Sequence, residues 1–181
     1  MTYKYAFSCS NKWDHLYLLS LKTALSFSVA VLDEHEVVPV AKSVSPQNDS
    51  AKISPLGIHL GNRLPAYATS TGKILLSRLN KELQIKWLER HSLKRLTPYT
   101  LIDPDGFLAV LQDISHHDYC ICKEEHELGV TAIAVPILNS QGDTIAALNC
   151  IGPSHRIDDQ YFIQQILPLL KQTAHELRAI L

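Results

Sequence analysis

Apolar and polar residues alternate along several short stretches of the chain, which is the pattern of a half-buried β-strand. Residues 26–32 and 37–44 show it, and the polar residues 33–36 between them predict a turn, so together they predict a β-hairpin. A second group of predicted strands lies in the last third of the chain, over residues 119–124, 131–138 and 144–151. Pro136 inside the middle one predicts an edge position or a bulge, because proline cannot donate to a sheet ladder.

In other stretches, apolar residues recur every three or four positions, as on the buried face of an amphipathic helix. We expect helices over residues 13–23, 74–79, 81–91, 103–116 and 158–180. Asp103 is placed to cap the fourth helix with Pro104 as its first residue, and Pro168 should kink the last helix. Two groups of strands separated by helices predict the α+β class, with a mostly antiparallel sheet flanked by helices.

The composition is that of one globular domain: 181 residues, 46% apolar and 19% charged, with a formal net charge of −1. Basic residues are scattered, and the densest group is Lys86, Arg90, Lys94 and Arg95. Such a group is typical of a solvated helix face. We therefore do not expect this chain to bind DNA directly by itself.

No stretch comes near the ~18 consecutive apolar residues of a membrane span, and the first residues lack the pattern of a signal peptide. The cysteines, at positions 9, 120, 122 and 150, are too few and too irregularly spaced for a disulfide scaffold. These features predict a cytoplasmic protein with reduced thiols and no membrane partner.

The most informative stretch is residues 63–73 (RLPAYATSTGK), which leads from an extended segment into a predicted helix. Pro65 disfavours helical angles at Leu64, so the helix has to begin after it. The hydroxyl residues 69–71 can cap free backbone N–H groups there, and those groups together with the helix dipole favour a bound anion. An ordinary capped helix is the alternative. Lys73 is expected to point to solvent.

Two later segments, 124–137 (EEHELGVTAIAVPI) and 142–153 (GDTIAALNCIGP), join this one in a recognisable order. With that order and spacing, the chain resembles the effector-binding domain of the IclR family of bacterial transcriptional regulators. That family typically shows Leu-Pro, a run of small residues and Gly-Lys, then Glu-Glu and Gly, then a strand ending in Gly-Pro. The resemblance assigns residues 13–181 to the effector-binding domain and residues 1–12 to an N-terminal extension.

The resemblance implies a GAF-like fold, in which a curved antiparallel sheet is flanked by helices. It implies a small organic or aromatic carboxylate as effector, a homodimer or tetramer, and no enzymatic activity, cofactor or metal. In the family, DNA is bound through an N-terminal winged helix-turn-helix. The twelve residues ahead of residue 13 contain no such pattern, so an excised domain, a truncated product and a stand-alone sensor all remain open.

The resemblance also implies a ligand site. Family positions place the anion-binding amides at Ser70 and Thr71. The remaining wall positions fall on Ile53, Leu56, Leu64, Cys122, Val130, Ala132, Asn149 and Ile151. Relatives that bind very small keto acids have an acid near position 122 and hydroxyls near positions 149 and 151. The thiol, amide and branched side chain found here favour a larger, more apolar acid, either aromatic or of medium chain length.

Other chemistry suggested by the sequence is a metal site or a reactive thiol. Cys120 and Cys122 have His116, His117 and His126 nearby, but structural zinc sites usually show Cys-x2-4-Cys pairs and a second ligand pair. A cysteine hydrolase would pair a thiol with a histidine, as Cys122 with His126 or Cys150 with His155. Alternation along the strand points Cys150 away from the pocket face.

Two further interpretations concern charge and assembly. Glu124, Glu125 and Glu127 are interpreted as a solvated turn or as partners of Lys123. An oligomerisation module that has lost its ligand remains an alternative to the sensor, because the apolar stripes of the first and last helices would serve a dimer in either case.

Overall fold

The computed structural model of the protein describes residues 14–44 and 59–178. The predicted wall residues Ile53 and Leu56 lie outside the described residues, as does the predicted N-terminal extension.

One antiparallel sheet forms the centre of the molecule, and its strands run in the order β3-β2-β1-β6-β5-β4. Both predicted groups of strands belong to it, so the predicted α+β class with an antiparallel sheet is confirmed. The strands are β1 (Ser26–Asp33), β2 (Glu36–Ser43), β3 (Leu64–Pro65), β4 (Cys120–Lys123), β5 (Val130–Leu138) and β6 (Thr144–Pro153).

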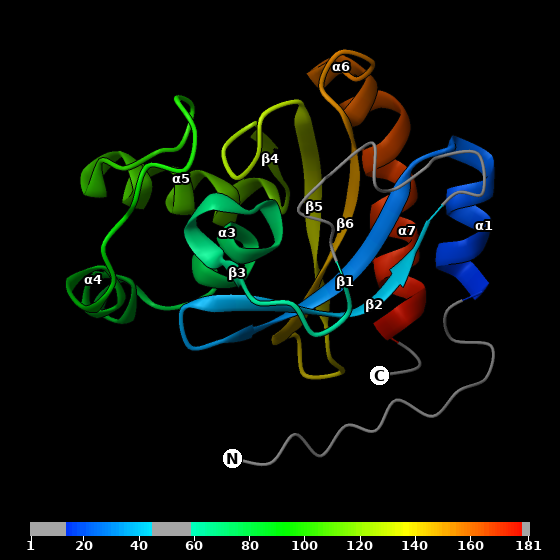
Figure 1. Ribbon diagram of the computed structural model, residues 1–181. Helices are drawn as coiled ribbons and strands as arrows, with labels where there is room; N and C mark the ends of the chain where they lie inside the picture. The colour runs from blue at the N-terminus through cyan, green and yellow to red at the C-terminus, as the bar shows by residue number, and fades with distance from the viewer. Residues whose placement is uncertain (1–13, 45–58, 179–181) are drawn as a thin grey trace.

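Helices cover both faces of this sheet (Figure 1). They are α1 (Asp14–Thr23), the 3-10 turn η1 (Ala66–Ala68), α3 (Ser70–Ser77), α4 (Lys81–Arg90), α5 (Pro104–His117), α6 (Asp159–Tyr161), the π-helix η2 (Phe162–Ile166) and α7 (Leu167–Arg178). One apolar core lies between the sheet and α1, η2 and α7, and a second lies between the sheet and η1, α3, α4 and α5. Within the described residues, no helix has the length and apolar character needed to cross a membrane.

Side chains alternate between these two cores along the central strands, as the period of two predicts. Phe27 and Val29 of β1 belong to the α7 side, whereas Ala30 belongs to the α3 side. Leu148 and Cys150 of β6 are fully buried on the α7 side. The intervening positions of both strands are therefore left to face α3.

Pro136 does not lie in an edge strand, because β5 has β4 and β6 as neighbours. The carbonyl of Val130 accepts a hydrogen bond from the amide of Glu124, so alternate residues of β5, including Pro136, direct their backbone polar groups to the β4 side. The pairing with β4 ends at Ala134. The missing N–H of Pro136 thus lies past the end of β4, and the irregularity in the ladder falls at Ile137 and Leu138.

The predicted long last helix is instead divided by the π-helix η2, which ends directly before Leu167 and Pro168. The amide of Leu167 donates to the carbonyl of Phe162, five residues back. This wider turn accommodates the N–H that Pro168 lacks. Six positions recur at helical spacing over the predicted helix 158–180: Phe162, Ile166, Leu170, Thr173 and Leu177 are buried, and Leu169 is only half-buried.

The other helices differ from prediction mainly at their ends. Asp103 caps α5 and accepts from the amide of Gly106 at 2.7 Å, with Pro104 in the first position, as predicted. The helix expected over residues 74–79 begins four residues earlier, at Ser70. In α4, Trp87 is buried, but Leu83, which belongs to the same apolar helical pattern, has 46% of its surface exposed. The reason is that α4 lies at the periphery of the fold (Figure 1).

Candidate ligand-binding site

A cavity of about 70 Å³ lies between the sheet, the start of α3 and the loop that follows β4. It collects all eight of the predicted site residues that the structure describes: Leu64, Ser70, Thr71, Cys122, Val130, Ala132, Asn149 and Ile151. Thr69, already expected at the cap of α3, also lines the cavity. Sequence reasoning missed the other wall residues, which are Ser28, Ala30, Val37, Pro39, Ala68, Glu125, His126 and Glu127. The wall residues on β1 and β2 lie at alternate strand positions. The period-two pattern of the predicted hairpin could therefore have placed them on one face of the sheet.

Thr69 fixes the start of α3 at one end of the cavity. It is the N-cap, in extended conformation, and its Oγ1 accepts from the amide of Gly72 at 3.1 Å. Its carbonyl accepts from the amide of Lys73 at 3.0 Å. The amides of Ser70 and Thr71 come ahead of these in the first turn, and within the described part of the chain neither donates to a protein acceptor. Two free N–H groups are thus available at the positive end of the helix dipole.

The hydroxyl of Ser70 is a third potential hydrogen-bond donor at the start of α3. Ser70 is 1% exposed, yet its Oγ has no hydrogen-bond partner among the described residues. A buried polar atom without a partner costs free energy, roughly 1–3 kcal/mol. An acceptor in the cavity would satisfy it.

Gly72 allows the start of α3 to lie directly against η1. A Cβ atom at this position would come within 2.1 Å of the carbonyl oxygen of Ala66, a backbone atom that cannot move aside easily. The close approach fixes Ser70 and Thr71 relative to the cavity. The glycine in the predicted motif thus has a packing reason.

Polar groups on the sheet form the facing wall. Ser28 of β1 donates from its Oγ to Oδ1 of Asn149 of β6 at 2.6 Å, and both residues are buried. Within the described residues the amide nitrogen of Asn149 makes no hydrogen bond, so it is available to a ligand. Around these groups the wall is mostly apolar.

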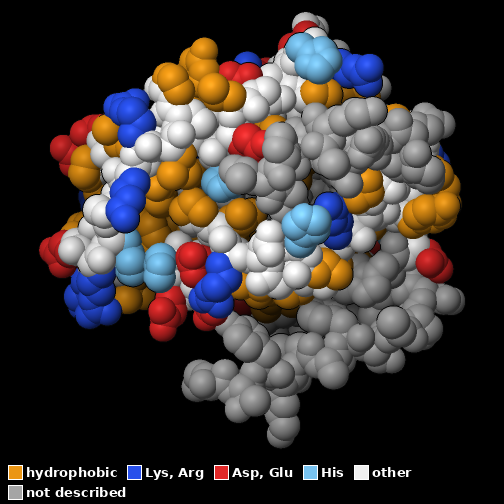
Figure 2. Space-filling view, viewed as in Figure 1, with side chains coloured by type: hydrophobic (Ala, Val, Ile, Leu, Met, Phe, Trp, Pro, Cys, Tyr) orange, Lys and Arg blue, Asp and Glu red, His pale blue; other side chains and the backbone are white. Residues whose placement is uncertain are grey.

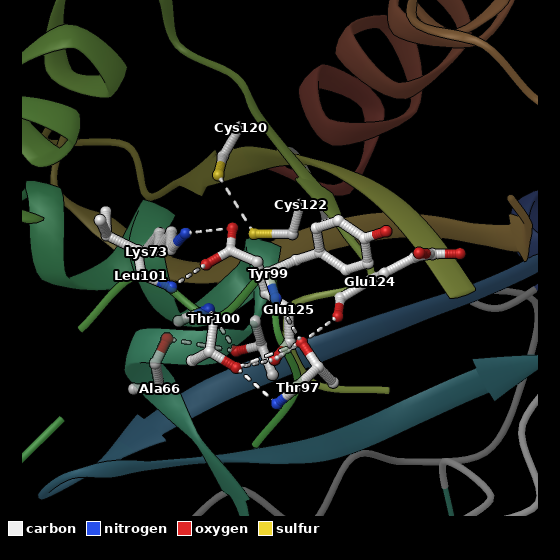
Figure 3. Close-up of polar contacts among 12 residues, drawn as sticks. Ala66, Lys73, Thr97, Tyr99, Thr100, Leu101, Cys120, Cys122, Glu124 and Glu125 are labelled. Atoms are coloured by element: carbon white, nitrogen blue, oxygen red, sulfur yellow. Dashed lines mark hydrogen bonds and ion pairs between the residues drawn. The ribbon is translucent and has the colours of Figure 1, made fainter. Parts of the chain in front are cut away.

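The solvent-facing positions predicted for Lys73 and Glu125 are wrong (Figure 3). Nζ of Lys73 lies 2.5 Å from Oε1 of Glu125, with the two side chains 3% and 12% exposed. The amide of Leu101 donates to the other carboxylate oxygen at 3.3 Å. Lys123, the partner expected for the glutamates, instead pairs with Asp159 at 2.8 Å. The sequence did not reveal the ion pair of Lys73 with Glu125, because the two residues are 52 positions apart.

The loop after β4 is held from a second side by two threonines. Thr97 Oγ1 donates to the carbonyl of Glu124 at 2.6 Å, and Thr100 Oγ1 donates to the carbonyl of Glu125 at 2.7 Å. Figure 3 shows these contacts gathered below the Lys73–Glu125 pair. The position of Glu125 in the cavity wall is thus fixed through both its side chain and its backbone.

The electrostatics around the Lys73–Glu125 pair favour a charged lysine beside a neutral Cys122 thiol. Burial lowers the pKa of Lys73, but the carboxylate of Glu125, which also accepts a hydrogen bond from Nζ, acts in the opposite direction, and the net shift is upward. The hydrogen bond with Cys120, 3.8 Å between sulfur atoms, and burial raise the pKa of the Cys122 thiol well above its usual value. Burial does the same to the pKa of Cys150. A nucleophilic cysteine needs the opposite shift, which argues against a hydrolase.

His126 also lines the cavity, and burial lowers its pKa, with Glu127 opposing the shift. The neutral imidazole is therefore favoured near pH 7. Within the described ranges, 14–44 and 59–178, no three histidine, cysteine or acidic side chains are grouped so as to hold a metal ion.

Comparisons with known proteins agree with this architecture. Residues 12–179 match the model of the bacterial transcriptional regulator IclR C-terminal family. The p-hydroxybenzoate hydroxylase transcriptional activator of Acinetobacter baylyi is 61% identical over 90% of this chain and 60% of its own length. The Pca operon regulatory protein of the same organism is 49% identical over 92% of this chain and 59% of its own length. The chain thus spans about 60% of these curated relatives.

Solved structures include two complexes with aromatic acids. The inducer-binding domain of a double mutant of the PobR transcription factor from Acinetobacter, in complex with 3-hydroxybenzoic acid, is 60% identical, with a TM-score of 0.87 over 93% of this chain and 95% of that one. An IclR homologue from Microbacterium hydrocarbonoxydans, complexed with 4-hydroxybenzoate, is 25% identical, with a TM-score of 0.80 over 93% of this chain and 65% of that one. The family and these relatives are transcriptional regulators rather than enzymes. The chain belongs to the IclR family of bacterial transcriptional regulators and is an effector-binding domain of that family.

Proposed function

We propose that this domain senses an aromatic carboxylate, with a hydroxybenzoate as the favoured class of effector. The observation that carries the proposal is the start of α3, where Ser70 and Thr71 line one cavity. Their amides and the hydroxyl of Ser70 have no hydrogen-bond acceptor among the described residues. These three donors suit a carboxylate. The mostly apolar remainder of the wall suits a ring, and similar domains have been solved with 3-hydroxybenzoic acid and with 4-hydroxybenzoate.

The size of the cavity implies that its walls move when the ring enters. Its volume is about 70 Å³, whereas an engineered cavity that binds benzene measures roughly 150 Å³. Leu64 and His126 are the half-buried wall residues at which we expect this movement. A ligand as small as glyoxylate would need no such movement.

Calorimetric titration tests the proposal. We expect 4-hydroxybenzoate or 3-hydroxybenzoate to bind more tightly than glyoxylate or pyruvate, because only the larger acids bury an apolar ring. Tighter binding of the keto acids would overturn the aromatic assignment. In the full-length regulator, a cytoplasmic protein on this proposal, the effector would alter operator binding through a DNA-binding segment outside this chain.

The second candidate function is a ligand-free oligomerisation module, which the surface of α1 favours. Tyr17, Leu18 and Leu21 are each at least 42% exposed there, and hydrophobic side chains gather over this helix in Figure 2. Thermal unfolding with a panel of acids separates the two functions. A ligand at a hundredfold excess over its Kd should add about 2.7 kcal/mol to the stability of a sensor and nothing to that of a scaffold.

A further inference from the structure

The Lys73–Glu125 pair lies beside the proposed anion site, but its two members do not meet the cavity equally. Glu125 is a wall residue, whereas Lys73 is not among the residues that line the cavity. Lys73 is in the first turn of α3, and its side chain is 3% exposed. A carboxylate held by the amides of Ser70 and Thr71 would therefore meet the negative member of the pair first.

This arrangement matters because the Lys73–Glu125 pair, called the corner, is shielded from solvent. Charges interact much more strongly across protein interior than across water, and salt screens buried charges weakly. The ammonium of Lys73 attracts an incoming anion, and the carboxylate of Glu125 repels it. Because the two groups are 2.5 Å apart, their effects largely cancel.

Other groups around Lys73 leave this balance unchanged. Cys120 and Cys122 lie beside it in β4 and are buried. The hydrogen bond to Cys120 and burial raise the pKa of the Cys122 thiol, which keeps that thiol uncharged. The amide of Leu101 donates to Glu125 and holds its carboxylate in place. The pair is thus a fixed, neutral unit next to the start of α3.

We propose that Glu125 is a specificity-determining residue of the cavity: by neutralising Lys73, it leaves a carboxylate ligand to be held by the amides and hydroxyl at the start of α3 and not by an ammonium ion. The inference rests on the proposed function, because it concerns the same site. Its consequence is that the preference of the domain for an acid over the matching neutral amide stays moderate. Removing the negative charge of Glu125 alone should increase the preference for the acid over the amide.

Calorimetry with 4-hydroxybenzoate and the neutral 4-hydroxybenzamide tests this on three variants. In Glu125→Gln, the acid should bind about tenfold more tightly relative to the amide than in the wild type, which corresponds to about 1.4 kcal/mol. The double variant Lys73→Met with Glu125→Gln again has no net charge in the corner, so its acid-to-amide ratio should equal the wild-type ratio. Glu124→Gln is the matched control, because it removes a neighbouring carboxylate that is not in the cavity wall.

The outcomes separate this inference from the proposed function. If the wild type binds 4-hydroxybenzoate and Glu125→Gln shows an unchanged or smaller acid-to-amide ratio, the inference fails and the proposed function stands. A ratio that falls strongly in the double variant also overturns the inference, because Lys73 itself would then hold the acid. If the wild type binds neither 4-hydroxybenzoate nor any other acid of the panel, both fail. Urea unfolding checks that each variant is folded. If Glu125→Gln does not fold, the acid-to-amide ratio of the double variant supplies the test.

Discussion

The hydroxyl of Ser28 donates to the side-chain oxygen of Asn149 over 2.6 Å and joins two neighbouring strands across the floor of the cavity. The bond holds the amide of Asn149 in one orientation, with its nitrogen available. If that nitrogen meets the ring hydroxyl of the effector, the orientation of Asn149 helps to distinguish hydroxybenzoates from benzoate.

Ser28→Ala should therefore weaken 4-hydroxybenzoate more than benzoate. We expect a relative loss of about fivefold, equivalent to roughly 1 kcal/mol for one hydrogen bond. Calorimetric titration with both acids measures it. Ser26→Ala is the control, because Ser26 is also a buried serine of β1 but is not in the cavity wall. Equal losses for both acids in Ser28→Ala would contradict the prediction.

Ser70→Ala should separate stability from ligand binding. Without ligand, the variant should be as stable as the wild type or slightly more so, because a buried hydroxyl without a partner is removed. Its affinity for 4-hydroxybenzoate should fall about tenfold, since a hydrogen bond to a charged group is worth roughly 1.5–3 kcal/mol. Thermal unfolding with and without the acid measures both effects. A large loss of stability without ligand would show that the hydroxyl has a structural partner.

Lys73→Met should destabilise the domain by about 3–5 kcal/mol, because it leaves the carboxylate of Glu125 buried without its cation. Urea unfolding measures the difference. The control is Lys86→Met, which breaks the pair of Lys86 with Glu82 on the exposed face of α4. That pair is worth at most about 0.5 kcal/mol. Similar losses in both variants would mean that burial of the Lys73 pair carries no special cost.

Gly72→Ala should be among the most damaging single changes, with a loss of about 3 kcal/mol or more, because its Cβ would overlap the backbone of Ala66. Gly129→Ala is a useful comparison. Gly129 has open space around its Cβ position but a φ of +78°, so the cost should be limited to about 1–2 kcal/mol of backbone strain. Denaturant unfolding ranks the two, and a reversed order would contradict the close approach of α3 to η1.

His126 should make the domain less stable in mild acid. Because burial lowers the pKa of His126 in the fold, the unfolded chain takes up this proton first as the pH falls below about 6.5, and stability decreases. The contribution is constant at higher pH. Urea unfolding at pH 7.5 and pH 5 should therefore show a smaller acid loss in His126→Asn than in the wild type. Equal losses in the two proteins would exclude His126 as the cause.

The features that sequence predicted well are local ones. The cap of α3 follows from hydroxyl residues next to an extended segment, and the shared face of Asn149 and Ile151 follows from strand alternation. The resemblance then selected which of these faces and caps to combine. Eight predicted residues consequently lie around one cavity.

The features that sequence did not predict depend on contacts between distant segments. Lys73 meets Glu125, and Ser28 meets Asn149, 121 positions away, only once the sheet has formed. A charged residue at a helix start usually faces solvent, and no local pattern marks Lys73 as buried. Leu83 shows the reverse case: a helical stripe does not reveal that the helix lies at the edge of the fold.

Pro136 has a consequence for how copies of this domain can meet. β4 is four residues long and β5 is nine, so the second half of β5 has no neighbour on that side among the described strands. An open strand edge invites a strand from another molecule, which is a common route to aggregation. A strand added there would meet the pyrrolidine ring of Pro136 at a position where pairing needs a backbone N–H donor. A second strand at this edge would therefore lack one backbone hydrogen bond, which disfavours pairing between copies there.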